Sequence, residues 1–283
     1  MTEGQNDGSS IEQQIDALLN EVAEKLRKSD QAEYKRYCEL PKEKKLEYVN
    51  ENWLKLATSV DEGRLREMNG LVHPLLSKTL SPQGIDEINR HLSPILGRKT
   101  VLTGEYHQIM TRLVVGNPDL TPKERVHLTL PSYLMLFEGV YLAEIDFLVY
   151  LLLQNGREYY TTGKKGKQSK TLKTYDEIEN EFTKQKLLFL DQEGFSAAVA
   201  GADRDLRNAI AHLDYALTND GVLGFNREAT ETPESLDYEA LDMKLGQLYE
   251  TTLCINRSIR DFYEQWMQDF VSFLSHFDGV KRS

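Results

Sequence analysis

Cysteine is scarce in this sequence. The chain has two cysteines among its 283 residues, Cys38 and Cys254. They lie too far apart for the short ligand spacings of a zinc site, and two such residues make no disulfide framework. This usage fits a reducing compartment, and the first ten residues, MTEGQNDGSS, lack the basic and then apolar order of a signal peptide. We therefore expect a cytoplasmic protein.

Excess positive charge is also missing. The formal net charge is −11 at pH 7, whereas proteins that coat nucleic acid without sequence preference are usually basic. The charge excludes such a packaging protein, although a local basic patch could still bind RNA. With 40% hydrophobic and 28% charged residues, the chain has the composition of a globular protein and not of a disordered one.

One hydrophobic run has the length of a membrane span, and it reads YLMLFEGVYLAEIDFLVYLLL at residues 133–153. It contains Glu138, Glu144 and Asp146, and each of these charges is costly at the centre of a bilayer. We expect this run to be a helix that is buried on nearly all sides in a bundle, and we expect no contact with a membrane.

Helix signals dominate the chain. Capping boxes at Ser9–Glu12 and Thr121–Glu124 mark two helix starts, and Thr174–Glu177 marks a third. Apolar residues at helical spacing predict helices after Ser9 and over 42–58, 82–96, 104–115, 132–154, 175–190, 195–217 and 236–277. Asn219-Asp220-Gly221, between two β-prone runs, predicts a small hairpin.

These patterns predict an all-α protein. We expect residues 119–283 to form a bundle of four core helices, with residues 1–118 as an additional helical region of unknown role. An apolar stripe follows the last helix, 236–277, and would pack along the bundle, from which it could extend to a partner subunit.

A polar cluster interrupts the apolar pattern of RDLRNAIAHLDYAL at residues 204–217. An arginine followed by a histidine after four to six residues arises about once by chance in a chain of this composition. One such pair, Arg66 and His73, ends at Pro74, where a helix would break, so we interpret it as the chance match.

The second such pair is Arg207 and His212, and its surroundings are more specific. Asn208 directly follows Arg207, and Asn208 and His212 are four residues apart, so they share one face of a helix. The long side chain of Arg207 can reach the same rim. An adjacent Arg-Asn pair in this pattern is expected by chance in about one chain in a hundred.

The stretch LRNAIAH resembles the Arg-Asn-x-x-x-His signature of the HEPN superfamily (higher eukaryotes and prokaryotes nucleotide-binding). The resemblance covers residues 120–283 through the order of the helices, and its specific part is residues 207–212. It implies a HEPN-like four-helix bundle and a metal-independent ribonuclease without a cofactor. It also implies a homodimer in which two motifs line one cleft. Members are common in toxin–antitoxin and antiviral defence systems, so an antitoxin or a regulatory protein is a candidate partner.

The residue types suit RNA cleavage independently of the family. RNA carries its own nucleophile, the 2′-hydroxyl group, so cleavage needs a group that moves a proton and a cation that holds the phosphate. Histidine titrates near neutral pH, so His212 suits the first task. Arg207 offers a planar, permanently charged donor to phosphate oxygens, and Asn208 can orient the histidine or donate to the phosphate. The alternative is that these residues are an ordinary polar rim on a packed helix.

Two acidic residues of the apolar helix are candidates for a supporting role. A buried carboxylate without a partner is costly, and Arg207 is the obvious partner for Glu138. Asp146 is eight residues from Glu138, about 80° around the helix, so both could face one seam. The alternative, which the sequence leaves open, is that both reach solvent at a gap in the bundle.

The segment REYYTTGKKGKQSKTLK, at residues 157–173, contrasts with the acidic chain because it holds six basic residues and one acidic residue. Basic residues beside aromatic rings suit single-stranded nucleic acid, with phosphates on the lysines and bases on the rings. The alternative is a flexible solvated loop. The candidate RNA-binding residues are Lys164, Lys165, Lys167, Lys170, Tyr159 and Tyr160.

Three classes of function remain open from the sequence. The first is a metal-independent endoribonuclease that acts on RNA as a homodimer, as a toxin or antiviral effector. The second is a non-catalytic HEPN-like module that binds nucleotide, RNA or a protein partner. The third is a helical scaffold. The intact set of Arg207, Asn208 and His212 favours the first.

Overall fold

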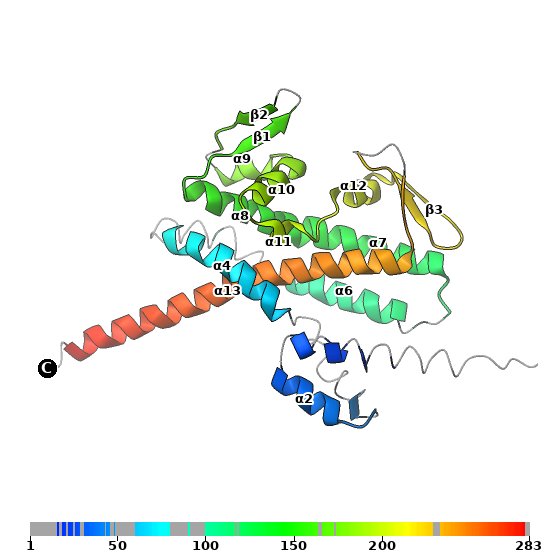
Figure 1. Ribbon diagram of the computed structural model, residues 1–283, viewed down its shortest axis with the longest axis horizontal. Coiled ribbons are helices and arrows are strands. Elements are labelled where there is room, and N and C mark those ends of the chain that lie inside the picture. The colour runs from blue at the N-terminus through cyan, green and yellow to red at the C-terminus, as the bar shows by residue number, and fades with distance from the viewer. Residues whose placement is uncertain are drawn as a thin grey trace, which may run out of the picture. The chain divides into compact units, whose positions relative to one another are not determined.

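The computed structural model describes residues 31–42, 60–79, 100–115, 119–163, 166–172, 174–228 and 233–280, with Arg90, Asn117 and scattered positions between 16 and 48. The described part is mostly helical with two small antiparallel sheets, in agreement with the expected all-α class (Figure 1). The chain divides into two compact units, residues 1–66 and 67–283. We expected a boundary near residue 118, but the helix that ends at residue 115 packs against the second unit's core.

The first unit contains α2 (Gln31–Glu39) and a small apolar cluster. Tyr37 is buried there, and its hydroxyl group donates a hydrogen bond to the carbonyl group of Leu19 at 3.1 Å. The expected capping box at Ser9 lies outside the described residues. So do most of the helix expected at 42–58 and most of the helix expected at 82–96.

The second unit is built around one long apolar segment. It consists of α7 (Pro122–Leu136), a π-helical turn η2 (Phe137–Tyr141) and α8 (Leu142–Gln154), which follow one another without a break. The predicted capping box at its start is confirmed, because Thr121 Oγ1 accepts from the Glu124 N–H at 3.3 Å and Glu124 accepts from the Thr121 N–H at 2.8 Å. The helix therefore begins earlier than the expected residue 132.

Helices cover this central segment on several sides. α6 (Thr100–Val115) and α13 (Tyr238–Val280) pack against α7 and η2, and α13 runs beside α7 in Figure 1. α9 (Tyr175–Glu179) and α10 (Thr183–Gln192) pack against α8. The run at 133–153 is thus largely buried, as expected. No helix in the described ranges has both the length and the apolar character that crossing a membrane requires.

The apolar stripe of α13 is used inside the unit over its first half. Five of its residues are buried in the core: Leu241, Leu245, Leu248, Ile255 and Ile259. The side chains of Phe270 and Phe273 lie outside the described part, so the expected extension to a partner subunit stays a prediction.

Two expected helices are interrupted. The helix expected at 175–190 is two helices, α9 and α10, which are separated at Asn180–Phe182. The helix expected at 195–217 is α11 (Ser196–Val199), a short connection, α12 (Arg204–His212) and a strand. The break before α12 follows from Asp203, whose side chain caps the new helix by accepting from the Leu206 N–H at 3.1 Å.

Both small sheets are antiparallel. The segment that we considered as a basic loop forms a hairpin, β1 (Tyr160–Gly163) with β2 (Gly166–Ser169). The hairpin predicted around Asn219-Asp220-Gly221 is confirmed as β3 (Tyr215–Leu217) with β4 (Leu223–Phe225). A third strand, β5 (Glu234–Leu236), was not predicted, because three residues are too few to show a strand pattern.

A proline does not end the helix α4 (Glu62–Thr79), contrary to our expectation for the segment around His73. Pro74 offers no N–H group, yet the helix continues because Met68, Val72 and Leu76 bury one face of it in the core. The imidazole Nε2 of His73 lies 2.9 Å from the carbonyl oxygen of Ser258, so this histidine has a packing role in the structure.

Candidate active site on helix α12

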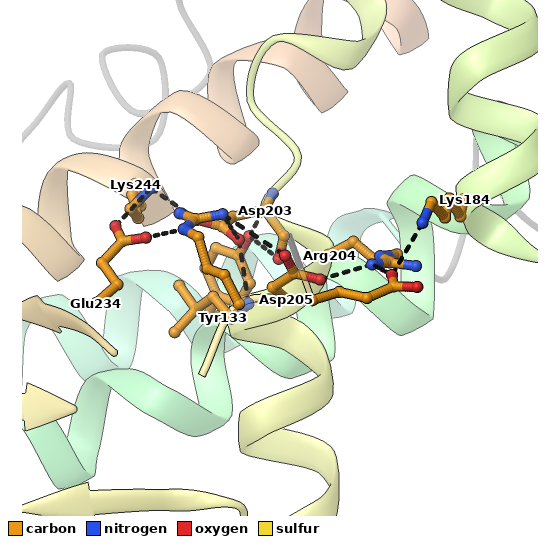
Figure 2. A network of polar contacts seen from close by, with 10 residues as sticks. Tyr133, Lys184, Asp203, Arg204, Asp205, Glu234 and Lys244 are labelled. Carbon is orange, nitrogen blue, oxygen red and sulfur yellow. Dashed lines mark hydrogen bonds and ion pairs between the residues drawn. The ribbon is translucent and has the colours of Figure 1, made fainter. Parts of the chain in front are cut away.

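The N-terminus of α12 is held by a network of charged residues. Asp203 is buried, and its carboxylate accepts from Arg227 at 2.7 Å and from Lys244 at 2.7 Å. The Tyr133 hydroxyl group donates to the Asp203 carbonyl oxygen at 3.2 Å and accepts from its N–H at 3.0 Å (Figure 2). These contacts tie α12 to α7, to α13 and to the segment after β4.

The same contacts decide the ionisation of Asp203. Burial by itself would raise the pKa of this carboxyl group. The hydrogen bonds from Lys244, from the Leu206 N–H and from Arg227 outweigh that effect, so the pKa is lowered. The cap of α12 is therefore a charged carboxylate at neutral pH.

Arg207 is oriented on two sides. Its Nε and NH2 groups both contact Glu138 Oε1, and its NH1 group donates to Asn208 Oδ1 at 2.8 Å. Glu138 belongs to the π-helical turn η2, a type of turn that is frequent at functional sites. The predicted contact between Glu138 and Arg207 is thus confirmed, although the Glu138 side chain is 37% exposed and not buried.

His212 is exposed, and it is the last residue of α12. It lies about 7.5 Å along the helix axis from Arg207, at 1.5 Å per residue. The next residue, Leu213, has a left-handed backbone with φ of 56° and is 77% exposed. A histidine in contact with solvent can exchange protons with a bound RNA, whereas a histidine packed in a core cannot.

The structure does not bring Asp146 to this cluster. Asp146 is buried, and its carboxylate is paired with Lys186 of α10 at 2.5 Å. Burial raises the pKa of Asp146 to about 6, and the charge and hydrogen bond of Lys186 offset part of that rise. The expected common seam of Glu138 and Asp146 is therefore absent: the first faces α12 and the second faces α10.

The basic hairpin keeps only some of its predicted binding residues accessible. Tyr159 is 1% exposed and packs edge-on against Phe189, with the ring centroids 4.9 Å apart, so a base cannot stack on it in this conformation. Tyr160 is half-buried, and its hydroxyl group donates to Glu158 at 2.6 Å. Lys170 is paired with the buried Glu181.

Three further candidate lysines of this segment have no described side chain. Lys164 and Lys165 lie outside the described residues, and Lys167 is described only by its backbone in β2. Their proposed contact with RNA stays a prediction. Among the residues that the structure describes, no three His, Cys, Asp or Glu side chains gather as metal ligands.

The charged network at Asp203 was not predicted as part of the site. It borders a pocket of about 170 Å³ that is also lined by residues 200–202 and by Gln247. The aspartate before a helical pattern is a capping signal that could have indicated Asp203. No sequence pattern links it to Arg227 and Lys244, because they come from segments far along the chain.

No known protein family, curated protein or solved structure matches this chain. The function is therefore argued from the residues of the site.

Proposed function

We propose that this protein is a HEPN-like, metal-independent endoribonuclease that acts as a cytoplasmic homodimer. The observation that carries the proposal is the pairing, on one short helix, of an exposed His212 with an Arg207 that two neighbouring side chains orient. A toxin or an antiviral effector would have this activity, and such a protein would need an antitoxin or a regulatory partner.

The cleavage step uses the RNA's own hydroxyl group. His212 accepts the 2′-hydroxyl proton, and the 2′-oxygen then attacks the adjacent phosphorus. The bond from phosphorus to the 5′-oxygen breaks, and that oxygen takes up a proton. Arg207 holds the phosphate while negative charge develops on its oxygens. The products are a 2′,3′-cyclic phosphate and a 5′-hydroxyl end.

The contacts of Arg207 also favour a second candidate function. Glu138 and Asn208 occupy both edges of its guanidinium group, as in a structural ion pair. A HEPN-like module that binds nucleotide, RNA or protein without cleaving would keep this arrangement.

Two substitutions separate the candidates. His212→Ala should abolish cleavage of labelled RNA in EDTA and keep RNA binding, whereas Arg207→Ala should lose cleavage and part of the binding. The matched control is His127→Ala, because His127 is an exposed histidine on α7. The endoribonuclease is excluded if a folded His212→Ala protein cleaves at the wild-type rate. A wild-type protein that binds RNA but never cleaves it would favour the binding module.

A further inference from the structure

A second pocket, of about 530 Å³, opens beside the N-terminal end of α12. Its apolar lining comes from α10, the end of α11 and the connection before α12, with Leu187, Leu188, Val199 and Ala202. Leu188 is 38% exposed although it is a large apolar residue. A volume of this size suits a small organic ligand, and the apolar part of the lining suits a flat ring.

Two cations converge on one point at the rim of this pocket. Lys184 Nζ lies 3.0 Å from Glu228 Oε2, and Arg204 NH2 contacts the same oxygen atom. Lys184 comes from α10 and Arg204 from α12, and Figure 2 shows the two side chains approaching each other. The Glu228 side chain is 57% exposed, so an anion from solvent can compete with it. A phosphate group would be held by the same two cations.

The rim also carries acceptors. Asp191 and Asp205 line the pocket, and Asp205 is paired with Arg204 at 2.7 Å. A bare polyanion would be repelled by these carboxylates. A ligand that combines one anionic group with a ring bearing N–H donors would be favoured, and a nucleotide with an amino-bearing base has both.

Two residues of the pocket lining, Arg204 and Asp205, belong to α12, the helix that also carries Arg207 and His212. Arg204 lies three residues before Arg207 and four before Asn208, so these side chains share one face of α12. At 1.5 Å per residue, Arg204 and His212 are about 12 Å apart along the axis. A short single strand of RNA can span that distance along the helix face.

We infer that this pocket binds one nucleotide of the RNA substrate next to the cleaved bond. The base lies on Leu187, Leu188 and Val199, and the phosphate lies between Lys184 and Arg204 in place of the Glu228 carboxylate. The pocket would then select the base beside the cleavage site. The assignment of this nucleotide to an RNA substrate rests on the proposed ribonuclease function. The chemical group that the pocket binds, a nucleoside phosphate, could equally come from a free nucleotide.

Calorimetric titration with cytidine 5′-monophosphate and with inorganic phosphate tests the pocket. Lys184→Ala and Leu188→Asp should each raise the Kd for the nucleotide at least about tenfold, because each removes one part of the contact. The matched controls are Lys123→Ala and Leu113→Asp. Lys123 is a lysine of α7 that donates to Asn219 at 3.3 Å, and Leu113 is a 52% exposed leucine of α6. Equal nucleotide affinity in the wild type and both pocket variants would overturn the inference, and so would phosphate binding as tightly as the nucleotide.

A single-stranded hexamer with 2′-O-methyl riboses identifies the source of the nucleotide. The inference expects the hexamer to displace cytidine monophosphate and to bind Lys184→Ala more weakly than Lys123→Ala. A hexamer that binds both variants equally would overturn the RNA assignment in favour of a free nucleotide. Because this RNA cannot be cleaved, the result does not depend on whether His212 is catalytic.

Discussion

At the scale of single residues, Glu138 fixes the orientation of the Arg207 side chain. The carboxylate contacts Nε and NH2 of the guanidinium group, which leaves the plane of that group fixed before any substrate binds. An arginine that is already oriented loses less side-chain entropy when it binds a phosphate than a free arginine does. Glu138 is thus a positioning residue in the proposed mechanism.

Glu138→Gln should lower kcat about 10- to 100-fold with a small change in KM, since it misplaces Arg207 without removing it. Glu138→Asp should restore part of the rate. The free energy of unfolding should change by less than about 1 kcal/mol, because the pair is partly exposed. Steady-state cleavage kinetics and thermal melts measure both. Glu193→Gln, which breaks the pair with Arg157 at 3.3 Å, is the control. A wild-type kcat in Glu138→Gln would contradict the positioning role.

Glu144 is fully buried, and its ionisation should control stability. A side-chain hydrogen bond with Asn256 favours the charged form and lowers the pKa of Glu144. Burial is the larger effect, so the pKa of Glu144 is well above its usual range. A raised pKa in the folded state stabilises the protein at low pH, and this contribution is lost as the pH rises through that pKa.

Glu144→Gln removes the ionisable group and keeps its shape. The variant should have nearly the same melting temperature as the wild type at pH 5 and a higher one at alkaline pH, with the difference growing as the pH rises. Thermal melts from pH 5 to pH 9 test this. A difference between the two proteins that is constant over this range would contradict a raised pKa of Glu144 in the folded protein.

At the scale of elements, the connection between α11 and α12 is fixed by a close approach to α13. A Cβ atom at Gly201 would lie 2.7 Å from the Gln247 carbonyl oxygen and 2.7 Å from Thr251 Oγ1. Only glycine fits at this distance without a shift of the backbone. The start of α12, and with it the position of Arg207, therefore depends on this contact.

Gly201→Ala should destabilise the protein by about 1–3 kcal/mol, because the new methyl group is overpacked. Gly246→Ala is the control on the helix α13 itself, since its Cβ atom would meet nothing within 4 Å. That control should stabilise the helix by about 0.5–1 kcal/mol. Chemical denaturation measures both values. The close contact is unimportant if the two variants have equal stability.

Local signals predicted the elements whose cause is local. The capping residues Thr121 and Thr174 begin helices as expected, and Gly221 has the left-handed φ of 76° that the turn between β3 and β4 requires. The interruptions were not predictable from helical spacing. One expected helix is interrupted at Gly201, which lies close to α13, and at Asp203, which caps α12 and also contacts Lys244 of α13. The local sequence does not contain the contacts with α13.

The candidate site shows the same division. The contact between Glu138 and Arg207 was predictable, because a carboxylate in an apolar segment requires a partner. Lys186 as the partner of Asp146 was not, because it belongs to a helix whose orientation is set by packing. Tyr159 and Tyr160 are adjacent and look alike in sequence, but only Tyr159 has its ring in the core.

At the scale of the whole molecule, Leu213 is the best candidate for a contact between two copies of the chain. It follows His212 directly, and it combines a left-handed backbone with high exposure. Both features are unfavourable for a leucine in an isolated chain, since the conformation is strained and the side chain is apolar. A partner surface that covers this side chain would offset that cost.

Leu213→Asn should weaken dimerisation without unfolding the protein, because asparagine tolerates the left-handed conformation and is polar. Light scattering at micromolar concentration should show the wild type as a dimer and the variant shifted toward monomer, with a parallel loss of RNA cleavage. Met243→Asn, at another exposed apolar residue, is the control. A monomeric wild type that cleaves RNA would contradict a composite active site.

The π-helical turn divides the central segment, residues 122–154, into two halves, α7 and α8, whose faces are turned relative to each other. A π turn holds one residue more than an α-helical turn, so α8 is rotated by about 100° relative to an uninterrupted helix. α7 can therefore present one face to α12 and α13, while α8 presents another to α9 and α10. The loss of a single residue within 137–141 would rotate α8 by about 100° and turn Asp146 away from Lys186. At this point the length of the chain, more than the identity of its residues, keeps the two halves in register.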